Sequence, residues 1–558
     1  MTPEDVLAIA KARAAANRAK YGHLTDAERI QALPVQNFAD REDLVDKWTA
    51  AFRRPASQAR LFPVQAEVLE TAAWAAQHPN IGLVGNVRVG GGKTLAFNLL
   101  PEVFDAKRPV LLLPPEMLED YKTALYAWSQ QFKFRRVHVV KYSELSRPEG
   151  TDLLRRLNPD LIMADEAQAL RHASSARTTR FLRYMEEVPE TRFVPMSGTL
   201  TGATLSDYSH LCYWALRQHS PLPHREDIVD LWGSVLNADG EPDEDAWLAL
   251  EWLDKDAAKR RNVDAMRKAF QRRFASAPGV VTTYDSSSGA RLVLTADYPT
   301  VNNDVRDALE QGRETYALPD GTELVDAVHY HRAMQQLSMG FYYVWDWEGE
   351  PDVEWLAARK AWWGACRGYL KDSAREGVDS PFLVEEYVRR EGRPKGLVDA
   401  LAAWDAQRHK PPPPTRAVWI DYGPVMRAVE WALARPRCFL WWRSRAVGEL
   451  LGELGVPKFG EGDGTPDPRK HPRAALSIAV HHKGRNYQAW DDQLVLEVPS
   501  SGAWWEQLLG RTHRYGQTSP EVRCSVFQRT WPQRNAFETA LDRARYIQDT
   551  TGQPQKLL

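Results

Sequence analysis

The sequence has few cysteines, no long apolar run and almost no net charge. Its 558 residues include four cysteines, Cys212, Cys366, Cys438 and Cys524, and none of them falls in a CxxC spacing. This distribution excludes a disulfide framework and a thiolate zinc site, and it predicts a reducing, intracellular setting. The formal charge of −2 at pH 7 excludes a basic, histone-like protein, so any contact with an acidic polymer has to come from a local patch.

Apolar segments of membrane-spanning length are also missing. No apolar run approaches the ~18 residues that a spanning helix needs. The first twenty residues alternate alanine with charged residues and lack the apolar centre of a signal peptide. We therefore expect a cytoplasmic protein without a membrane partner.

The distribution of apolar residues divides the chain. Short apolar runs alternate with helical stretches at about residues 58–216 and again at 416–530, which is typical of parallel sheets covered by helices. Residues 217–415 are Trp-rich and helix-like, and they end in four prolines. We predict an α/β fold with two parallel-sheet lobes and a mainly helical insertion between them. A helical extension (1–57) precedes the lobes, and a charged helix and tail (531–558) follow.

Several local elements can be placed within this scheme. Asp26 is a plausible helix cap in the extension. The expected strands are residues 81–84, 110–113, 137–140, 161–164 and 193–196 in the first lobe, and 438–441, 476–480 and 494–498 in the second.

A glycine-rich loop follows the first expected strand and precedes an apolar helical run. It consists of Gly90, Gly91, Gly92, Lys93 and Thr94. Glycines let consecutive backbone N–H groups close around a phosphate at a helix N-terminus. The lysine can neutralise phosphate oxygens, and the threonine hydroxyl can ligate Mg²⁺. The alternative is a glycine-rich turn without a ligand.

Two carboxylates follow the expected strand at 161–164. Asp165 suits a metal-holding group, and Glu166 suits a group that polarises the attacking water of a phosphoryl transfer. An Asp-Glu pair at a strand end is usually solvated. Its position downstream of a phosphate loop favours the functional interpretation.

A third pattern lies in the second lobe, at residues 507–517. It reads Q-x-x-G-R-x-H-R-x-G-Q and includes Gln507, Arg511 and Arg514. Two arginines three residues apart on a helix project together, as two groups reaching a γ-phosphate across a cleft would have to do. A solvated arginine-rich helix face is the alternative, but the spacing is unusually specific.

In these segments the chain resembles superfamily-two helicases and translocases, and within them the Swi/Snf-like group. The resemblance covers roughly residues 58–530. The histidine and the terminal Gly-Gln of segment 507–517 are hallmarks of that group that DEAD-box RNA helicases do not share. Arg60 and Gln65 resemble the segment with which the family reads adenine, and Ser197 and Thr199 resemble the motif that couples nucleotide state to lobe movement.

The resemblance implies two RecA-like lobes that bind ATP and Mg²⁺ in the cleft between them. The implied catalytic residues are Glu166, Gln507, Arg511 and Arg514. The implied ATP-binding residues are Arg60, Gln65, Gly90, Gly91, Gly92, Lys93 and Thr94, with Thr94 and Asp165 holding Mg²⁺. The implied coupling residues are Gln168, Ser197, Thr199 and Gly484.

The chain also departs from the family pattern. Val87 stands where the strict phosphate-loop pattern has its first glycine, and Gln168 stands where the group usually has histidine. His481 and His482 replace a pair of glycines, while Gly484 can still be aligned. Metal binding by the two histidines is disfavoured, because neighbours on a strand end would point to opposite faces.

Residues 255–273 have a local charge of +6 in an otherwise nearly neutral chain. Such a run can contact a nucleic-acid backbone without regard to sequence. A solvated helix face with a buried stripe of Met266, Phe270 and Phe274 explains it equally well. The candidate contacts are Arg260, Arg261, Lys268, Arg272 and Arg273.

The tryptophans of the insertion allow two interpretations as well. They include Trp345, Trp347, Trp355, Trp362 and Trp363. Stacking on nucleic-acid bases is one, and packing within the insertion is the one that we favour.

From the resemblance we expect an ATP-dependent translocase that moves on duplex DNA in a bacterial or viral host cytoplasm. One alternative is a strand-separating helicase acting on DNA or RNA. Another is an ATPase subunit that depends on protein partners in a DNA-processing complex.

Overall fold

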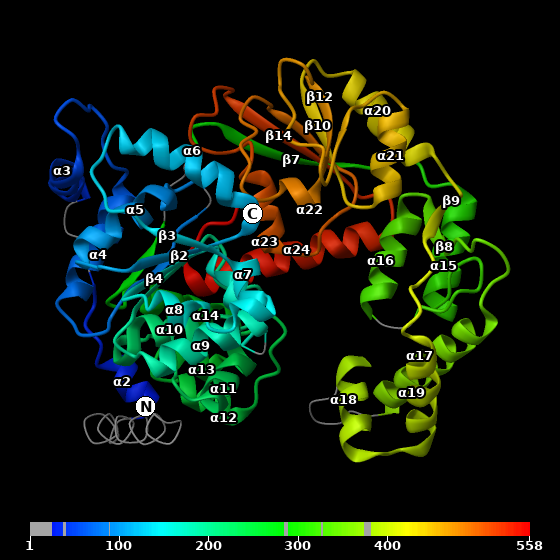
Figure 1. The fold of residues 1–558 in the computed structure, drawn as a ribbon, viewed down its shortest axis with the longest axis horizontal. Coiled ribbons are helices and arrows are strands. Elements are labelled where there is room, and N and C mark those ends of the chain that lie inside the picture. The colour runs from blue at the N-terminus through cyan, green and yellow to red at the C-terminus, as the bar shows by residue number, and fades with distance from the viewer. Residues whose placement is uncertain are drawn as a thin grey trace.

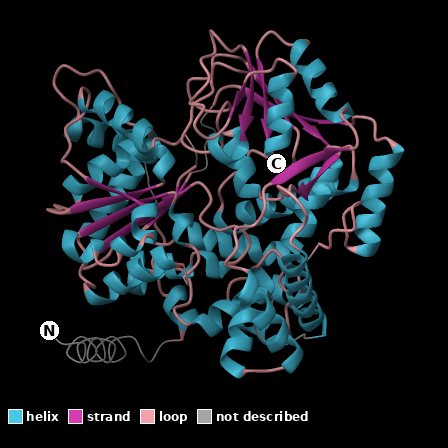
Figure 2. Cartoon of the chain, turned by 45° about the vertical axis from the view of Figure 1, so that its right-hand side comes forward, coloured by secondary structure: helices cyan, strands magenta, loops and turns pink. Residues whose placement is uncertain are grey.

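The computed structural model describes residues 25–36, 41–88, 90–173, 175–283, 288–324, 327–372 and 381–558. Parts of the expected N-terminal extension, residues 1–24 and 37–40, lie outside this range, as does Val89 of the glycine-rich loop. Two six-stranded sheets form two lobes, and helices cover them (Figures 1 and 2). The α/β class and the two parallel sheets expected from the sequence are confirmed.

The sheet of lobe 1 is wholly parallel and has the order β3-β2-β4-β5-β1-β6. Its strands are β1 (Val84–Asn86), β2 (Pro109–Leu113), β3 (His138–Lys141), β4 (Leu161–Asp165), β5 (Arg192–Ser197) and β6 (Val280–Thr282). Its helices are α3 (Arg41–Phe52), α4 (Pro63–Ala76), α5 (Lys93–Val103), α6 (Leu118–Ser129), α7 (Tyr142–Ser146), α8 (Leu153–Leu157), α9 (Ala176–Glu187) and α10 (Ser209–Leu216).

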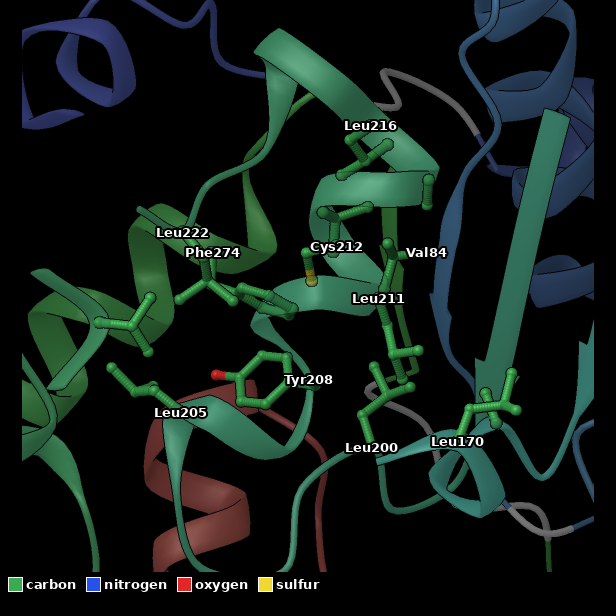
Figure 3. Close-up of a cluster of buried hydrophobic side chains, with 14 of the residues drawn as sticks. Val84, Leu170, Leu200, Leu205, Tyr208, Leu211, Cys212, Leu216, Leu222 and Phe274 are labelled. Atoms are coloured by element: carbon green, nitrogen blue, oxygen red, sulfur yellow. The ribbon is translucent and has the colours of Figure 1, made fainter. Parts of the chain in front are cut away.

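Alternate residues of the strands pack into two cores, one on each face of the sheet. In β2, Val110 and Leu112 join the core that contains α10, whereas Leu111 and Leu113 join the core of α4 and α5. The first core includes the buried thiol of Cys212, close to Tyr208 and other apolar side chains (Figure 3). All four cysteines are free and buried, so the predicted absence of disulfides is confirmed.

Lobe 2 repeats this design with the order β11-β12-β10-β13-β14-β7, again wholly parallel. Its strands are β7 (Arg291–Asp297), β10 (Cys438–Trp442), β11 (Lys458–Phe459), β12 (Arg473–Ser477), β13 (Asp492–Val495) and β14 (Glu521–Phe527). Its helices are α20 (Gly423–Leu433), α21 (Arg445–Glu453), α22 (Ile478–His481), α23 (Gly502–Leu509) and α24 (Trp531–Thr551).

The prediction that residues 217–415 form a single helical insertion is wrong. The first part of this segment packs on the core of lobe 1 as α11 (Glu226–Leu236), α12 (Glu244–Leu250), α13 (Lys255–Arg260) and α14 (Val263–Ala275). Its middle supplies β6 to the first sheet and β7 to the second. These two short strands complete the sheets, so lobe 1 extends to residue 283 and lobe 2 begins at 291.

The remaining insertion extends away from the lobes (Figure 1). It contains α15 (Asn303–Thr315), α16 (Ala327–Ser338), an antiparallel ribbon of β8 (Phe341–Trp345) and β9 (Thr415–Trp419), and the helices α17 (Val353–Asp372), α18 (Pro381–Glu391) and α19 (Lys395–Gln407). The last three helices enclose a small core of their own around Trp362.

Helix α24 runs from lobe 2 back to lobe 1 and contacts α14, α16 and α23. Beyond its end, residues 552–558 lie between the lobes. The side-chain amide of Asn86, at the end of β1, donates to the carbonyl of Thr551 at 3.1 Å. The segment expected to be a charged helix and tail is therefore a link between the lobes.

Two further local predictions are corrected. Thr25, and not Asp26, caps α2 (Asp26–Gln31), because its hydroxyl accepts from the backbone of Glu28 in a capping box. The expected strand at 476–480 ends at Ser477, and α22 begins at Ile478. No helix among the described residues combines the length and apolar character needed to cross a bilayer.

Candidate functional site

A cavity of about 650 Å³ lies between the lobes. Lobe 1 lines it with the glycine-rich loop, the start of α5, one side of α6 and the end of β4. Lobe 2 lines it with residues 483–486 and with the segment that begins at α23. The three motifs singled out from the sequence therefore meet at one cavity.

The glycine-rich loop is held in a conformation that only glycine adopts easily. Gly90 has φ 85° and Gly92 has φ 76°, both in the left-handed region. A side chain at Gly92 would also meet the amide of Gln65 at 2.3 Å. Lys93 begins α5, and its ammonium donates to the carbonyl of Val87 at 3.1 Å. The loop therefore places left-handed glycines and a buried ammonium at the N-terminus of α5, where a phosphate can bind.

The two carboxylates at the end of β4 lie within reach of this ammonium. Glu166 Oε1 is 3.7 Å from Lys93 Nζ. Burial raises the pKa of Asp165 to about 7. Burial alone would also raise the pKa of Glu166, but Lys93 and Gln168 hold it below its usual value. Glu166 has φ 52° in the left-handed region, a strained conformation for a residue with a side chain, and such strain is concentrated at functional sites.

Gln168 joins Glu166 to Ser197. Its amide nitrogen donates to Glu166 Oε2 at 2.7 Å, and its carbonyl oxygen accepts from the Ser197 hydroxyl at 2.5 Å. The Ser197 hydroxyl in turn accepts from the backbone N–H of Thr199 at 2.9 Å. Gln168 thus forms a continuous chain of hydrogen bonds from Glu166 to the segment of Ser197 and Thr199.

One hydrogen bond crosses the cavity from lobe 2. The side-chain amide of Gln507 donates to Glu166 Oε2 at 3.2 Å, and both residues are buried. Glu166 therefore receives donors from its own lobe and from the opposite one. Any change in the separation of the lobes changes the surroundings of this carboxylate.

The prediction that Arg511 and Arg514 lie on a helix is wrong: α23 ends at Leu509, and both arginines follow it and line the same cavity. Arg511 donates to the carbonyls of Gln507 at 2.9 Å and Arg485 at 2.8 Å, which fixes its position. Burial lowers the pKa of Arg511 to about 10 and also lowers the pKa of Arg514. Both remain cations at neutral pH in a partly desolvated site, where they interact strongly with a developing negative charge.

Sequence reasoning missed the side of the cavity formed by α6. It includes Asp120, whose pKa burial raises against the opposing effect of nearby arginines. Tyr121 also lines the cavity and donates from its hydroxyl to Asn98 at 2.9 Å. Phe62 and Tyr515 approach from opposite lobes, with ring centroids 5.2 Å apart. Only the position of α6 directly after β2 could have suggested this side.

Several predicted ATP contacts lie elsewhere. Arg60 is exposed outside the cavity and pairs with Glu42 at 2.8 Å and with Asp46 at 2.9 Å. Gln65 is buried behind the loop, where its amide donates to the carbonyl of Gly92 at 3.0 Å and accepts from the N–H of Phe62 at 2.8 Å. Gly91, Ser197 and Thr199 do not line the cavity either, whereas Gly484 does. Arg60 and Gln65, which were expected to read adenine, thus do not line this cavity, and Gln65 contacts the glycine-rich loop from behind.

The two adjacent histidines are buried at the end of α22 and not on a strand. His481 bonds the Tyr487 hydroxyl at 2.5 Å, and His482 stacks on Trp504 with centroids 4.7 Å apart. Burial lowers the pKa of both to about 4. Within the described ranges no cluster of three or more His, Cys, Asp or Glu side chains could hold a metal ion.

The basic run of α13 and α14 contributes no residue to the lining of this cavity. Arg260, Lys268 and Arg272 are exposed, and Arg261 pairs with Glu244. Arg273 is committed to the backbone, because it donates to the carbonyls of residues 30 and 33. Met266, Phe270 and Phe274 are buried, as expected for an amphipathic helix.

The tryptophans of the insertion pack against one another. Trp355 contacts the rings of Trp345, Trp347 and Trp404 edge to face, and Trp362 is buried in the core of α17–α19. Packing, the interpretation that we favoured, accounts for them.

No protein-family model matches the chain, and a search of curated proteins finds no match either. The site therefore has to be interpreted from its own geometry and chemistry. It combines a glycine-rich loop at a helix N-terminus, a buried ammonium, two carboxylates and two cations from the opposite lobe. This set of groups can bind a nucleoside triphosphate and stabilise charge on its terminal phosphate.

Proposed function

We propose that the chain is an ATP-dependent translocase of the Swi/Snf-like type that couples ATP hydrolysis to movement on duplex DNA. The observation that supports this most is the hydrogen bond from Gln507 to Glu166, in a cavity that also contains Lys93 and Arg511. Groups from both lobes surround one candidate catalytic carboxylate. Such an arrangement makes hydrolysis depend on how the lobes are placed.

The residues present fit ATP and Mg²⁺. The left-handed Gly90 and Gly92 leave room for phosphate oxygens, and the Thr94 hydroxyl and Asp165 carboxylate supply the oxygen ligands that Mg²⁺ prefers. Bound Mg²⁺ would neutralise charge on the β and γ oxygens.

Each side chain then has a defined part. Lys93 binds the β and γ oxygens, Glu166 orients and activates the attacking water, and Gln507 and Gln168 hold the Glu166 carboxylate in position. Arg511 and Arg514 stabilise the charge that develops on the γ-phosphate. The preference for duplex DNA rests on the resemblance of segment 507–517 to the Swi/Snf-like group.

Steady-state ATP hydrolysis tests the proposal, measured without nucleic acid and then with single-stranded, duplex or forked DNA or with RNA, at two salt concentrations. We expect strong stimulation by plain duplex that falls at high salt, because phosphate contacts release counterions. Stimulation only by forks, single strands or RNA would favour a strand-separating helicase. No stimulation would favour a subunit that needs a protein partner.

Two substitutions test the assignment of residues. Lys93→Ala and Glu166→Gln should each abolish turnover, while the exposed Lys122→Ala, made on α6, should leave it unchanged. Wild-type turnover in either of the first two variants would contradict the proposed site.

A further inference from the structure

A second cavity, of about 210 Å³, lies where the insertion meets lobe 2. It opens at the edge of the second sheet at which β10 and β13 end. Its lining comes from α16, from β8, from the turn into α21 and from the residue pair after β13. The lining polar residues are Arg332, Gln335, Gln336, Tyr343, Arg443, Ser444, Arg445 and Glu497.

Two arginines reach this cavity from opposite sides, and the charge of one of them, Arg443, acts on the carboxylate of Glu497. Arg332 extends from α16 and Arg443 from the end of β10, and both are exposed. Across the part of the chain that the structure describes, neither forms an ion pair. Arg445 pairs with Glu449 of its own helix at 2.6 Å. The side chains of Arg332 and Arg443 are therefore available to an anion.

The single carboxylate of the cavity is occupied by the protein itself. Glu497 accepts from the backbone N–H of Arg443 at 2.6 Å and of Ser444 at 2.7 Å, and also from the Ser444 hydroxyl. Its oxygens are turned to these donors. Because Arg445 is paired with Glu449, Arg332 and Arg443 stand against the one carboxylate of Glu497, and the cavity keeps one excess positive charge.

The amide of Gln336 also lines the cavity. The residue is 8% exposed, and its side chain forms no hydrogen bond to another described residue. Its amide can therefore donate to a ligand with acceptor oxygens. The amide of Gln336 and the guanidinium groups of Arg332 and Arg443 together place hydrogen-bond donors on both sides of the cavity.

A stack of side chains connects this cavity to the first one. The guanidinium of Arg443 lies 5.8 Å from the centroid of the Trp504 ring, and His482 stacks on Trp504 with centroids 4.7 Å apart. His482 is 6% exposed and immediately precedes Lys483 and Gly484, which line the first cavity. Both of its ring nitrogens lack a hydrogen-bond partner among the described residues, so stacking is what fixes its position.

We propose that the second cavity binds a backbone phosphate of the nucleic acid, and that the stack of Arg443, Trp504 and His482 connects its occupancy to the first cavity. The guanidinium fork matches the geometry of phosphate oxygens, and the amide of Gln336 adds a neutral donor. The polymer named here rests on the proposed function. The phosphate site itself follows from the donors that line the cavity.

The test measures binding of a fluorescent 30-base-pair duplex by anisotropy over a range of KCl concentrations, using the full chain. Arg332→Ala and Arg443→Ala are compared with Arg437→Ala, which removes an exposed arginine from the opposite end of β10. We expect each cavity variant to raise Kd about tenfold or more. Each should also reduce the salt slope by about 1, with Arg437→Ala unchanged.

Unchanged Kd and slope in both cavity variants would overturn the phosphate site. An equal loss in Arg437→Ala would also overturn it, because the effect would then be general electrostatics. Inorganic phosphate serves as the competitor, at concentrations at which the wild type and Arg437→Ala still bind duplex equally. If it displaces no duplex from the wild type under these conditions, the cavity does not recognise phosphate.

The connection is tested separately, with Trp504→Leu and His482→Asn. Both should bind duplex within about twofold of the wild type and keep basal ATP turnover, but lose most of the stimulation by duplex. Retained stimulation in both would overturn the connection. If the wild type hydrolyses no ATP while the arginine variants still lose binding, the proposed function fails and the phosphate site stands. If duplex stimulates turnover equally in the wild type and in every variant, the phosphate site fails and the proposed function stands.

Discussion

Lys556 and Glu506 form a buried ion pair that we expect to stabilise the contact between the lobes. Lys556 Nζ lies 3.4 Å from Glu506 Oε1, and the two side chains are 5% and 1% exposed. The backbone N–H of Lys556 also donates to Glu506 Oε2 at 2.8 Å. Glu506 directly precedes Gln507, so this pair helps to fix the helix that contacts Glu166.

Replacing Lys556 with Met should destabilise the chain strongly. Removing one partner of a buried pair costs about 3–5 kcal/mol, because the other charge stays buried without compensation. Glu506 would keep the backbone donor of residue 556, so we expect the lower end, about 3 kcal/mol. The double variant Lys556→Met with Glu506→Leu should lose clearly less than the sum of the single variants, since no uncompensated charge remains.

Urea unfolding followed by tryptophan fluorescence at pH 7 measures these changes in a double-mutant cycle. Lys122→Met, which breaks an exposed pair with Glu119, is the matched control and should cost less than about 1 kcal/mol. A Lys556→Met variant as stable as this control would refute the reasoning. So would strictly additive effects of the two substitutions, because additivity means that the side chains do not interact.

Three other predictions follow from the site. Gly92→Ala should raise the KM for ATP, since a side chain there meets Gln65. The control Gly396→Ala, with open space around the residue, should leave KM unchanged. Equal KM values in the two variants would contradict the loop geometry. Gln168→Ala should lower kcat on the order of 10- to 100-fold with little change in ATP affinity, because Glu166 loses an orienting donor. An unchanged rate constant of hydrolysis in single-turnover assays would count against this prediction. Three histidines, the buried His481 and His482 and the partly buried His224, each have a pKa lowered by desolvation to about 4. They should destabilise the fold as the pH falls below their unfolded value of about 6.5, since only the unfolded chain then takes up their protons. Urea midpoints at pH 7.5 and at about pH 5.5 should show a loss of about 1 kcal/mol for each histidine, and a flat profile would exclude this effect.

The sequence predicted several central strands because each is a short apolar run buried on both faces, but it missed β14, a central strand in which Arg523 and Ser525 interrupt the apolar run. The runs at 110–113, 161–164 and 193–196 lie within β2, β4 and β5. It did not predict β6 or β7. β6 has only three residues, and most of β7 is partly exposed, so neither forms an apolar run. Edge strands of this kind are defined by pairing with a neighbour that is distant in sequence.

One apolar run was assigned to the wrong kind of element. Ile478 begins α22, although Ile-Ala-Val following Ser477 is as typical of a buried strand as of a helix. Periodicity cannot separate the two in so short a run. The error affected the site, because it placed His481 and His482 on opposite faces when both are in fact buried in lobe 2.

The candidate site was predictable where a motif specifies its own backbone. Lys93, Asp165, Glu166 and Arg511 meet in one cavity because each lies at the end of a strand or helix that the parallel sheets bring to a common edge. Asp120 gave no such signal. Its place in the cavity depends on how α6 packs against the sheet, which local sequence does not specify.

Gln168 stands where the proteins that this segment resembles usually have histidine, and the two side chains can offer similar hydrogen bonds with different chemistry. A neutral histidine offers one donor and one acceptor, and the amide of Gln168 uses one of each, toward Glu166 and from Ser197. An amide has no proton that titrates near neutral pH, whereas histidine does. The connection between Glu166 and Ser197 therefore keeps the same donors and acceptors across the physiological range of pH, because neither the amide nor the hydroxyl titrates there.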